Sequence, residues 1–237
     1  ENALRIGAIE NLAPKRIFTE LQLILSEENP FPVIKRLFEL KLLQAVHPEW
    51  TWPPKGEALF GEIRAVLSWF DLLYLNEPYE KWLIYFLALT QPVGRIGELR
   101  LRLGLPKKVA DLLNLSREEG DRIINTLQRN PNLPRSDIYK LLSPLPNEVL
   151  LFLMARTNQE TGRKAISLYF TQLKSVRIST RGEDLKRLGI PPGPLYKTIL
   201  NALLESRLNG KVLTAEDEMA YVTQHFLPQR ERQIGNI

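Results

Sequence analysis

The chain has 237 residues, 44% of them hydrophobic and 25% charged, which argues against a disordered protein, and its lack of cysteine excludes disulfide scaffolds and thiolate metal sites. Lysine and arginine exceed aspartate and glutamate by five, a mild basic excess that permits an anionic partner such as nucleic acid. No apolar run approaches the roughly 18 to 20 residues of a spanning helix and no signal peptide opens the chain, which predicts a soluble, cytoplasmic protein.

Helical spacing of apolar residues dominates the chain from its beginning. From Ile17 these residues recur at i, i+4, i+7 and i+8, and Pro14 stands at the expected first turn, where its missing N–H costs nothing. The pattern continues through residues 33–40 and stops at the tryptophan- and proline-rich segment 48–54. Further periodicity predicts helices at residues 57–74, 78–89, 99–103, 116–128, 136–142, 146–156 and 159–176.

Local signals mark where several of these helices begin. Ser116 and Glu119 have the spacing of a capping box, which predicts a helix start at this point. Residues 175–180 are the only strand candidate, since no other stretch alternates with period two. The sequence therefore predicts an all-α fold.

The last part of the chain has the clearest breaks. The segment 189–194 is the strongest breaker, and Pro194 then opens a helix. Asn209 and Gly210 are a good signal for the end of that helix. Thr214 is a candidate cap for one more helix.

Patterns typical of catalysis are missing. The chain has no Gly-x-Ser-x-Gly elbow, no phosphate-binding glycine loop and no Asp-x-Asp pair for two-metal chemistry. The acidic cluster Glu216, Asp217 and Glu218 lies in the first turn of a predicted helix, so helix capping is favoured over metal binding. His47 precedes a proline at a helix end and is interpreted as a buried or capping histidine rather than a catalytic one.

The basic residues are unevenly distributed. Residues 163–187 carry seven positive side chains against two negative ones, a net charge of +5 that equals the excess of the whole chain. Such a segment suits a phosphate backbone, and a solvated helix face explains it equally well. The positive side chains are Arg163, Lys164, Lys174, Arg177, Arg181, Lys186 and Arg187. A second group is interpreted as a solvated face: Arg95, Arg100, Arg102, Lys107 and Lys108.

Gly193 and Pro194 offer a more specific possibility. A Gly-Pro helix start presents free N–H groups, here those of residues 195–197, which can hold a phosphate together with the helix dipole and the charge of Lys197. The alternative is a tight connection between helices. Trp50 and Trp52 are interpreted as packing anchors, with a base-stacking or docking surface at 50–54 as the alternative.

The segments 14–43 and 185–218 together resemble the class II tRNA nucleotidyltransferases and bacterial poly(A) polymerases. The first carries the pattern Arg-Ile-x-x-Glu-Leu-x-x-Ile-Leu of the family's neck, with Lys41 where the family commonly has glycine. The second is similar to the C-terminal end of the family, and residues 169–189 resemble the branch with CBS and DHH-type domains upstream. The matching neck residues are Arg16, Ile17, Glu20, Leu21, Ile24 and Leu25.

The family's catalytic head has no counterpart here. Its Gly-Gly-x-Val-Arg-Asp, Asp-x-Asp, Arg-Arg-Asp and Glu-Asp-x-x-Arg motifs are absent, and in the family they precede the neck. The resemblance therefore implies an all-helical, elongated C-terminal region with neck (1–47), body (48–189) and tail (190–237). It places Mg²⁺ and ATP or CTP in the missing head and none in this chain. Arg16 and Glu20 are expected to form a structural pair rather than an RNA contact.

The resemblance implies that body and tail grip a tRNA along its acceptor arm and elbow while the head adds nucleotides to the 3′ end. We expect Lys and Arg of 163–187, with Gly193 and Lys197, to contact phosphates and to recognise RNA shape. One alternative is the same region of a poly(A) polymerase acting on mRNA ends. Another is a helical protein–protein interaction module.

Overall fold

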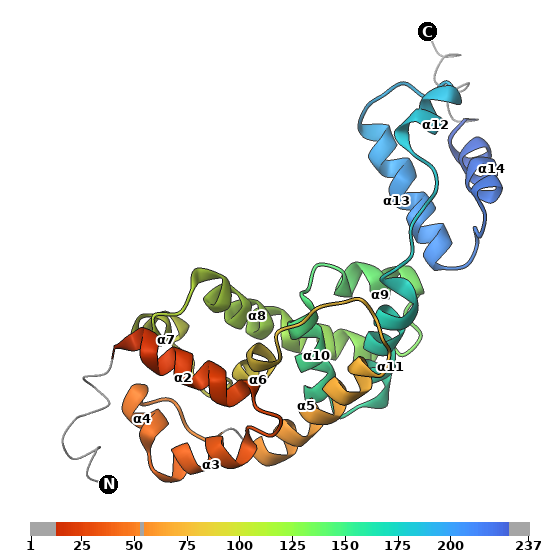
Figure 1. The fold of residues 1–237 in the computed structure, drawn as a ribbon. Helices are drawn as coiled ribbons and strands as arrows, with labels where there is room; N and C mark the ends of the chain where they lie inside the picture. Colours follow the sequence, from red (N-terminus) through yellow and green to blue (C-terminus); the bar gives the residue numbers. More distant parts are fainter. Residues whose placement is uncertain (1–12, 53–54, 228–237) are drawn as a thin grey trace. The chain divides into compact units, whose positions relative to one another are not determined.

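The computed structural model describes residues 13–52 and 55–227. These residues form helices joined by turns and extended segments, without a strand, so the predicted all-α fold is confirmed for them (Figure 1). The chain divides into two compact units. Unit 1 comprises residues 1–131 and 145–163, and unit 2 comprises residues 132–144 and 164–237. The three consecutive segments expected from the resemblance are a different division and stay a prediction.

Unit 1 is built around two almost wholly apolar helices. Seven residues of α6 (Lys81–Leu89) and seven of α10 (Asn147–Arg156) are buried, and α10 packs on both α6 and α5 (Gly56–Asp71). α2 (Pro14–Ser26) lies against α6 and α7 (Ile96–Leu103). The other helices of this unit are α3 (Phe31–Glu39), α4 (Leu42–Val46) and α8 (Lys107–Arg129).

The turn between α3 and α4 holds a lysine in a backbone conformation that favours glycine. Lys41 adopts φ 55° and ψ 22°, the left-handed conformation that costs an ordinary residue energy and glycine almost none. Arg16 and Glu20 form no ion pair, contrary to expectation, and instead line an apolar cavity of about 360 Å³ together with residues of α3 and α4.

The tryptophans of the segment between α4 and α5 are packing residues. Trp50 is completely buried and its indole N–H donates to the carbonyl of Leu89 at 2.8 Å. Trp52 is half-buried and makes edge-to-face contacts with Phe31 and Phe38. A docking or base-stacking surface made by Trp50 and Trp52 is therefore wrong, while residues 53–54 lie outside the described residues.

The helix predicted to start at Ser116 is one part of a longer helix. α8 runs unbroken over 23 residues, with Ser116 buried in its middle and Glu119 paired with Arg122 instead of capping. The apolar stripe of α8, including Leu112 and Ile123, is buried on both sides of Ser116, so packing keeps the helix continuous.

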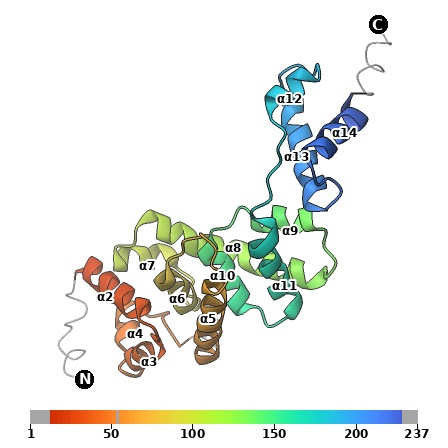
Figure 2. The ribbon, with the colours of Figure 1, turned by 45° about the vertical axis from the view of Figure 1, so that its right-hand side comes forward.

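Unit 2 contains α9 (Arg135–Leu142), the five-residue π-helical turn η1 (Tyr169–Leu173), α12 (Gly182–Arg187), α13 (Pro194–Leu208) and α14 (Ala215–Phe226). α11 (Glu160–Leu168) leads into η1 and crosses the boundary between the units after Arg163. α13 lies between neighbours, since it contacts both α9 and α14. α12, α13 and α14 lie together in both views (Figures 1 and 2).

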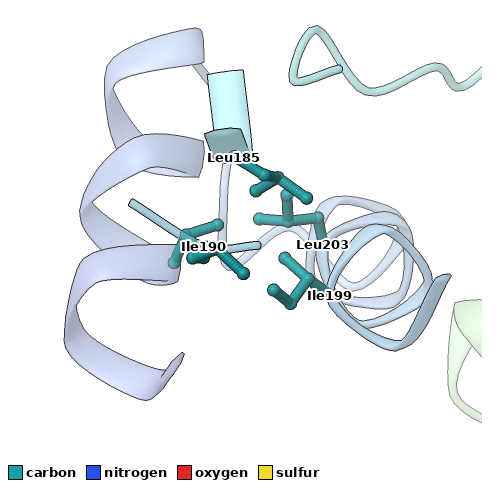
Figure 3. Packing of buried hydrophobic residues seen from close by; sticks show 5 residues of the cluster. Leu185, Ile190, Ile199 and Leu203 are labelled. Carbon is teal, nitrogen blue, oxygen red and sulfur yellow. The ribbon is translucent and has the colours of Figure 1, made fainter. Parts of the chain in front are cut away.

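The small core of unit 2 is formed where α12, α13 and α14 meet. Its buried residues are Leu185, Ile190, Ile199, Leu203 and Val222. Figure 3 shows the side chains of Leu185, Ile190, Ile199 and Leu203 pointing toward one another from α12, the following turn and α13. This core fixes the start of α13 beside α12.

The predicted signals near this core are partly confirmed. Pro194 is the first residue of α13, Gly210 takes the left-handed φ of 71° after its end, and Thr214 caps α14. α12 is a helix that periodicity missed, because six residues are too few to show a stripe. The strand candidate 175–180 pairs with no strand and runs as an extended segment.

Candidate nucleic-acid interface

Most of the predicted RNA-binding side chains lie on the surface of unit 2. Five of the seven basic residues of segment 163–187 are exposed, and Lys197 is exposed as well. The exposed members of the segment are Lys164, Arg177, Arg181, Lys186 and Arg187. The described part of unit 2 therefore presents cations on several elements: the extended segment 175–181, α12 and the start of α13.

Arg163 does not join this group. It belongs to unit 1, where its guanidinium pairs with the carboxylate of Glu62 and donates to the carbonyl of Thr157 at 3.1 Å. Both partners are in unit 1, so Arg163 serves the packing of that unit. The basic segment is thus divided by the unit boundary, which follows contacts in space that charge counting cannot reveal.

Two cations of unit 2, Lys174 and Arg177, lie just after η1. The ammonium of Lys174 lies 5.5 Å from the centre of the Phe170 ring, and Lys174 is half-buried. The Nη1 of Arg177 donates to the carbonyls of Lys174 and Val176 at 2.7 and 2.8 Å. These bonds satisfy carbonyls at the end of the helical turn and fix the direction in which the exposed Arg177 leaves the backbone.

α12 begins and ends with positive side chains around one carboxylate. The carboxylate of Asp184 accepts the backbone N–H of Arg181 at 2.7 Å and pairs with the guanidinium of Arg187. The Arg181 backbone N–H, followed by the Arg187 guanidinium, lowers the pKa of Asp184 below its ordinary value. Because the side chain of Arg187 is still 78% exposed, its pairing with Asp184 leaves it at the surface.

The start of α13 lies beside the start of α12. A Cβ atom built on Gly182 would come within 3.3 Å of the Tyr196 ring, and the Tyr196 hydroxyl donates to the carbonyl of Ile190 at 2.9 Å. Gly193 precedes α13 with extended backbone, φ 165°, and needs no glycine-specific conformation. The backbone at Gly182 therefore packs against the first turn of α13 at Tyr196.

The expected set of three free N–H groups at the start of α13 is incomplete. The Tyr196 N–H donates to the carbonyl of Gly193 at 3.0 Å, so it is not free for a phosphate. The first-turn 3₁₀-type bond is a common way for a helix to satisfy an early N–H group. An anion at the start of α13 would therefore be attracted by the charge of Lys197 and by the positive end of the helix dipole.

The acidic cluster at the start of α14 divides into two roles. Asp217 forms a capping box: its carboxylate accepts the N–H of Thr214 at 2.9 Å, and its own N–H donates to the Thr214 hydroxyl at 3.1 Å. The Thr214 and Leu213 N–H groups lower the pKa of Asp217 below its ordinary value. The predicted capping role is therefore confirmed for Asp217, and Glu216 is exposed beside it.

Glu218 has a role that sequence analysis missed. It is completely buried, and its carboxylate accepts hydrogen bonds from Ser179, Thr180 and Arg207. Burial raises the pKa of Glu218, but the bonds from Thr180, Ser179 and Arg207 outweigh it and hold the pKa below its ordinary value. Its place in a run of three acids concealed this role, and the only local signal is that Glu218 lies four residues before Val222, the other buried residue of α14.

The second basic group, on α7 and the start of α8, is largely paired within unit 1. Arg95 bonds to the carboxylates of Glu49 and Glu98 at 2.8 and 2.9 Å, and Arg102 donates to the carbonyl of Val46 at 3.3 Å. The Glu49 carboxylate raises the pKa of Arg95. Lys107 pairs with Asp111, while Arg100 and Lys108 are exposed without an ion pair to a described residue. The interpretation of this group as a solvated, structural face is thus supported.

Both histidines make local contacts, and the Nε2 of His47 lies 3.7 Å from a carboxylate oxygen of Glu98. His47 is buried, and its Nδ1 accepts the N–H of Glu49 at 3.3 Å, which agrees with the capping interpretation. His225 stacks on Tyr221 with ring centres 4.1 Å apart. No group of three or more His, Asp or Glu residues that could hold a metal ion occurs in the described chain.

No single helix of the described chain has both the length and the apolar composition needed to cross a membrane.

Comparison with known proteins adds independent observations. Residues 6–52 match the family described as "Probable RNA and SrmB-binding site of polymerase A". An A-adding tRNA nucleotidyltransferase of Geobacter sulfurreducens is 39% identical over 225 residues, which are 92% of this chain and 26% of that protein. The A-adding tRNA nucleotidyltransferase of Halalkalibacterium halodurans is 23% identical over 220 residues, 93% of this chain and 48% of that protein. The chain is therefore similar over most of its length to part of two A-adding tRNA nucleotidyltransferases.

Solved structures show the same fold. A CCA-adding enzyme in its apo form superposes with a TM-score of 0.72 at 20% identity, covering 94% of this chain and 52% of that one. A Thermotoga maritima CCA-adding enzyme complexed with tRNA gives a TM-score of 0.71 at 20% identity, over 94% of this chain and 54% of that one. This chain spans between about a quarter and a half of the length of the relatives named here.

Proposed function

We propose that this chain is the tRNA-binding region of a nucleotidyltransferase that adds A or CCA to tRNA 3′ ends. It holds the acceptor arm while a catalytic head of the longer protein adds the nucleotides. The observation that carries the proposal is the exposed set of cations in unit 2, on the segment 175–181, on α12 and at the start of α13. Relatives over most of the chain carry the name of such an enzyme.

The chemistry of the interface suits a phosphate backbone. Arginine forks and lysine ammonium groups on neighbouring elements match the spaced negative charges of an RNA helix. The described residues offer no exposed aromatic platform within this group, so recognition rests on charge and shape rather than on stacking with bases. Mg²⁺ and the nucleoside triphosphate belong, in this proposal, to the head, and no step of the reaction is assigned to residues of this chain.

A gel-shift titration with tRNA at increasing salt tests the proposal. Phosphate contacts release counterions, so affinity falls on a log–log plot by about 0.7 to 0.9 per contact. With four to six contacts made by the exposed cations, we expect a slope between about −3 and −5. A flat salt dependence, or no binding at low salt, contradicts the proposal.

A poly(A) polymerase is the second candidate. The family matched by residues 6–52 is described by reference to polymerase A, which favours this alternative. The longer protein should then extend an unstructured mRNA fragment as well as or better than tRNA. A strong preference for tRNA in a competition between the two RNAs supports the first proposal.

A further inference from the structure

The buried carboxylate of Glu218 binds the middle of the segment 175–181. Its two oxygens accept the N–H of Ser179 at 2.9 Å, the N–H of Thr180 at 2.7 Å and the hydroxyl of Thr180 at 2.7 Å. Arg207 of α13 donates to the same carboxylate at 2.6 Å. A single side chain of α14 thus ties together the extended segment 175–181 and α13.

This anchor lies between two exposed cations. Arg177 is two residues before Ser179, and Arg181 follows Thr180 directly. An extended segment lacks the internal hydrogen bonds that fix a helix, so its course depends on the groups it meets. At the middle of the segment these are the Glu218 carboxylate and the apolar contact of Ile178 with the small core, and at its ends they are the hydrogen bonds of Arg177 and Arg181 described above.

Burying a carboxylate is expensive unless donors surround it. The core beside it is apolar, and a packed apolar residue on α14 would serve that core without this cost. The carboxylate instead defines the path of the backbone at residues 179–180. Two adjacent backbone N–H groups and a hydroxyl can all donate to it only when the backbone follows this path.

We propose that Glu218 is a positioning residue for RNA binding, which holds the segment 175–181 so that Arg177 and Arg181 meet neighbouring phosphates. This inference rests on the proposed function and deepens it. A negative charge so close to the cations would by itself repel RNA. Removing it should therefore strengthen binding if charge alone mattered, and weaken binding if Glu218 positions the two arginines.

The test measures the tRNA dissociation constant and its salt slope for the full chain and for E218Q. The matched control is E216Q, because Glu216 is exposed on the same turn and loses the same charge without touching the segment 175–181. We expect E218Q to bind tRNA about 3- to 10-fold more weakly, with a salt slope reduced by about one to two contacts. E216Q should bind as well as the unchanged chain or slightly better.

A double-mutant comparison separates positioning from general loss of structure. R177A/R181A should weaken binding, and adding E218Q to it should change the dissociation constant by less than about twofold, because the residues through which Glu218 acts are gone. Equal or tighter binding by E218Q, or an undiminished effect of E218Q in the double-arginine background, overturns the inference.

Two further results keep the test decisive. If circular dichroism shows that E218Q does not fold, T180V is tested instead. This substitution removes only the hydrogen bond from the Thr180 hydroxyl to the Glu218 carboxylate, and it should also weaken tRNA binding. Unchanged binding by folded T180V then overturns the inference. If R177A/R181A binds tRNA normally, both the inference and the proposed interface fail, whereas failure of E218Q alone leaves the proposed function standing.

Discussion

Among the described residues, both units contain paired and unpaired positive side chains, and the instructive comparison is between paired arginines of unit 1 and unpaired lysines of unit 2. In unit 1 the guanidinium groups of Arg95, Arg156 and Arg163 are paired with carboxylates of the same unit. In unit 2, Lys186 and Lys197 are exposed and form no ion pair with a described residue. Charge used inside a unit contributes to packing, whereas charge left at the surface is available to a partner. Counting charges along the sequence cannot distinguish the two.

The hydrophobic cores of the two units also differ in the residues that form them. Unit 1 buries large aromatic residues such as Trp50, Phe86 and Phe152, while the apolar centre of α12, α13 and α14 consists of five aliphatic residues. A small core needs polar anchors to define its surface, and Glu218 is such an anchor. We therefore expect substitutions in unit 1 to act mainly on stability, and substitutions on the surface of unit 2 to act mainly on RNA affinity.

The largest effect should come from the core of unit 1. W50A removes a completely buried indole and its hydrogen bond to Leu89, and should lower the free energy of unfolding by about 3–5 kcal/mol. Urea denaturation measures it. W50F keeps most of the volume and should cost clearly less. A loss below about 1 kcal/mol for W50A would show that this core is not what holds unit 1 together.

Charge reversal should distinguish the two surfaces next. R177E/K186E in unit 2 should weaken tRNA binding by about 30-fold or more, since two contacts become repulsive. The matched pair R100E/K108E lies on exposed positions of unit 1 and should weaken binding less than about threefold through the change in net charge. Gel shifts at one salt concentration give both values. Equal losses for the two pairs would remove the distinction between the units.

Acid should destabilise unit 2 through Glu218. Its pKa is lowered by folding, so its contribution is complete above 4.5, the ordinary value of the group, and is lost as the pH falls through the lower folded value. Asp184 and Asp217 contribute with the same sign. Thermal melts between pH 7 and pH 3 should show this loss, and E218Q should show a smaller one. An identical pH dependence for E218Q would contradict the role given to this carboxylate.

The smallest effect concerns the turn between α3 and α4. K41G replaces a residue at φ 55° by one that adopts this conformation freely, and should raise the free energy of unfolding by about 0.5–1 kcal/mol after the greater freedom of glycine in the unfolded chain is subtracted. K41A, which keeps the strain, is the control and should give no gain. Thermal melts compare the stability of the two variants with that of the unchanged chain. Neither substitution should change the affinity for tRNA.

The sequence was sufficient for features that depend on local spacing. Apolar periodicity and prolines placed most helices, and Thr214 with Asp217 predicted the cap of α14 correctly. Prediction from the sequence failed where contacts between residues far apart in the chain determine the structure. The helix start at Ser116 was overridden by packing along α8, and α12 was too short to have a period.

The candidate interface shows the same limit. Net charge located the basic segment, but the pairing of Arg163 with Glu62 joins residues 101 positions apart. The contact of Glu218 with Ser179 and Thr180 spans nearly forty positions and turns a suspected capping residue into a buried anchor. Such relations follow from the fold and leave no trace in local patterns.

The most direct test of this account is lysine footprinting of the unchanged chain with and without tRNA. An amine-reactive acylating reagent, followed by mass spectrometry, reports the accessibility of each lysine. The account predicts protection of Lys186 and Lys197 in unit 2 and unchanged labelling of Lys108, which is also exposed and lies in unit 1. Protection of Lys108 with unchanged labelling of Lys186 and Lys197 would contradict the claim that unit 2 carries the RNA-binding surface.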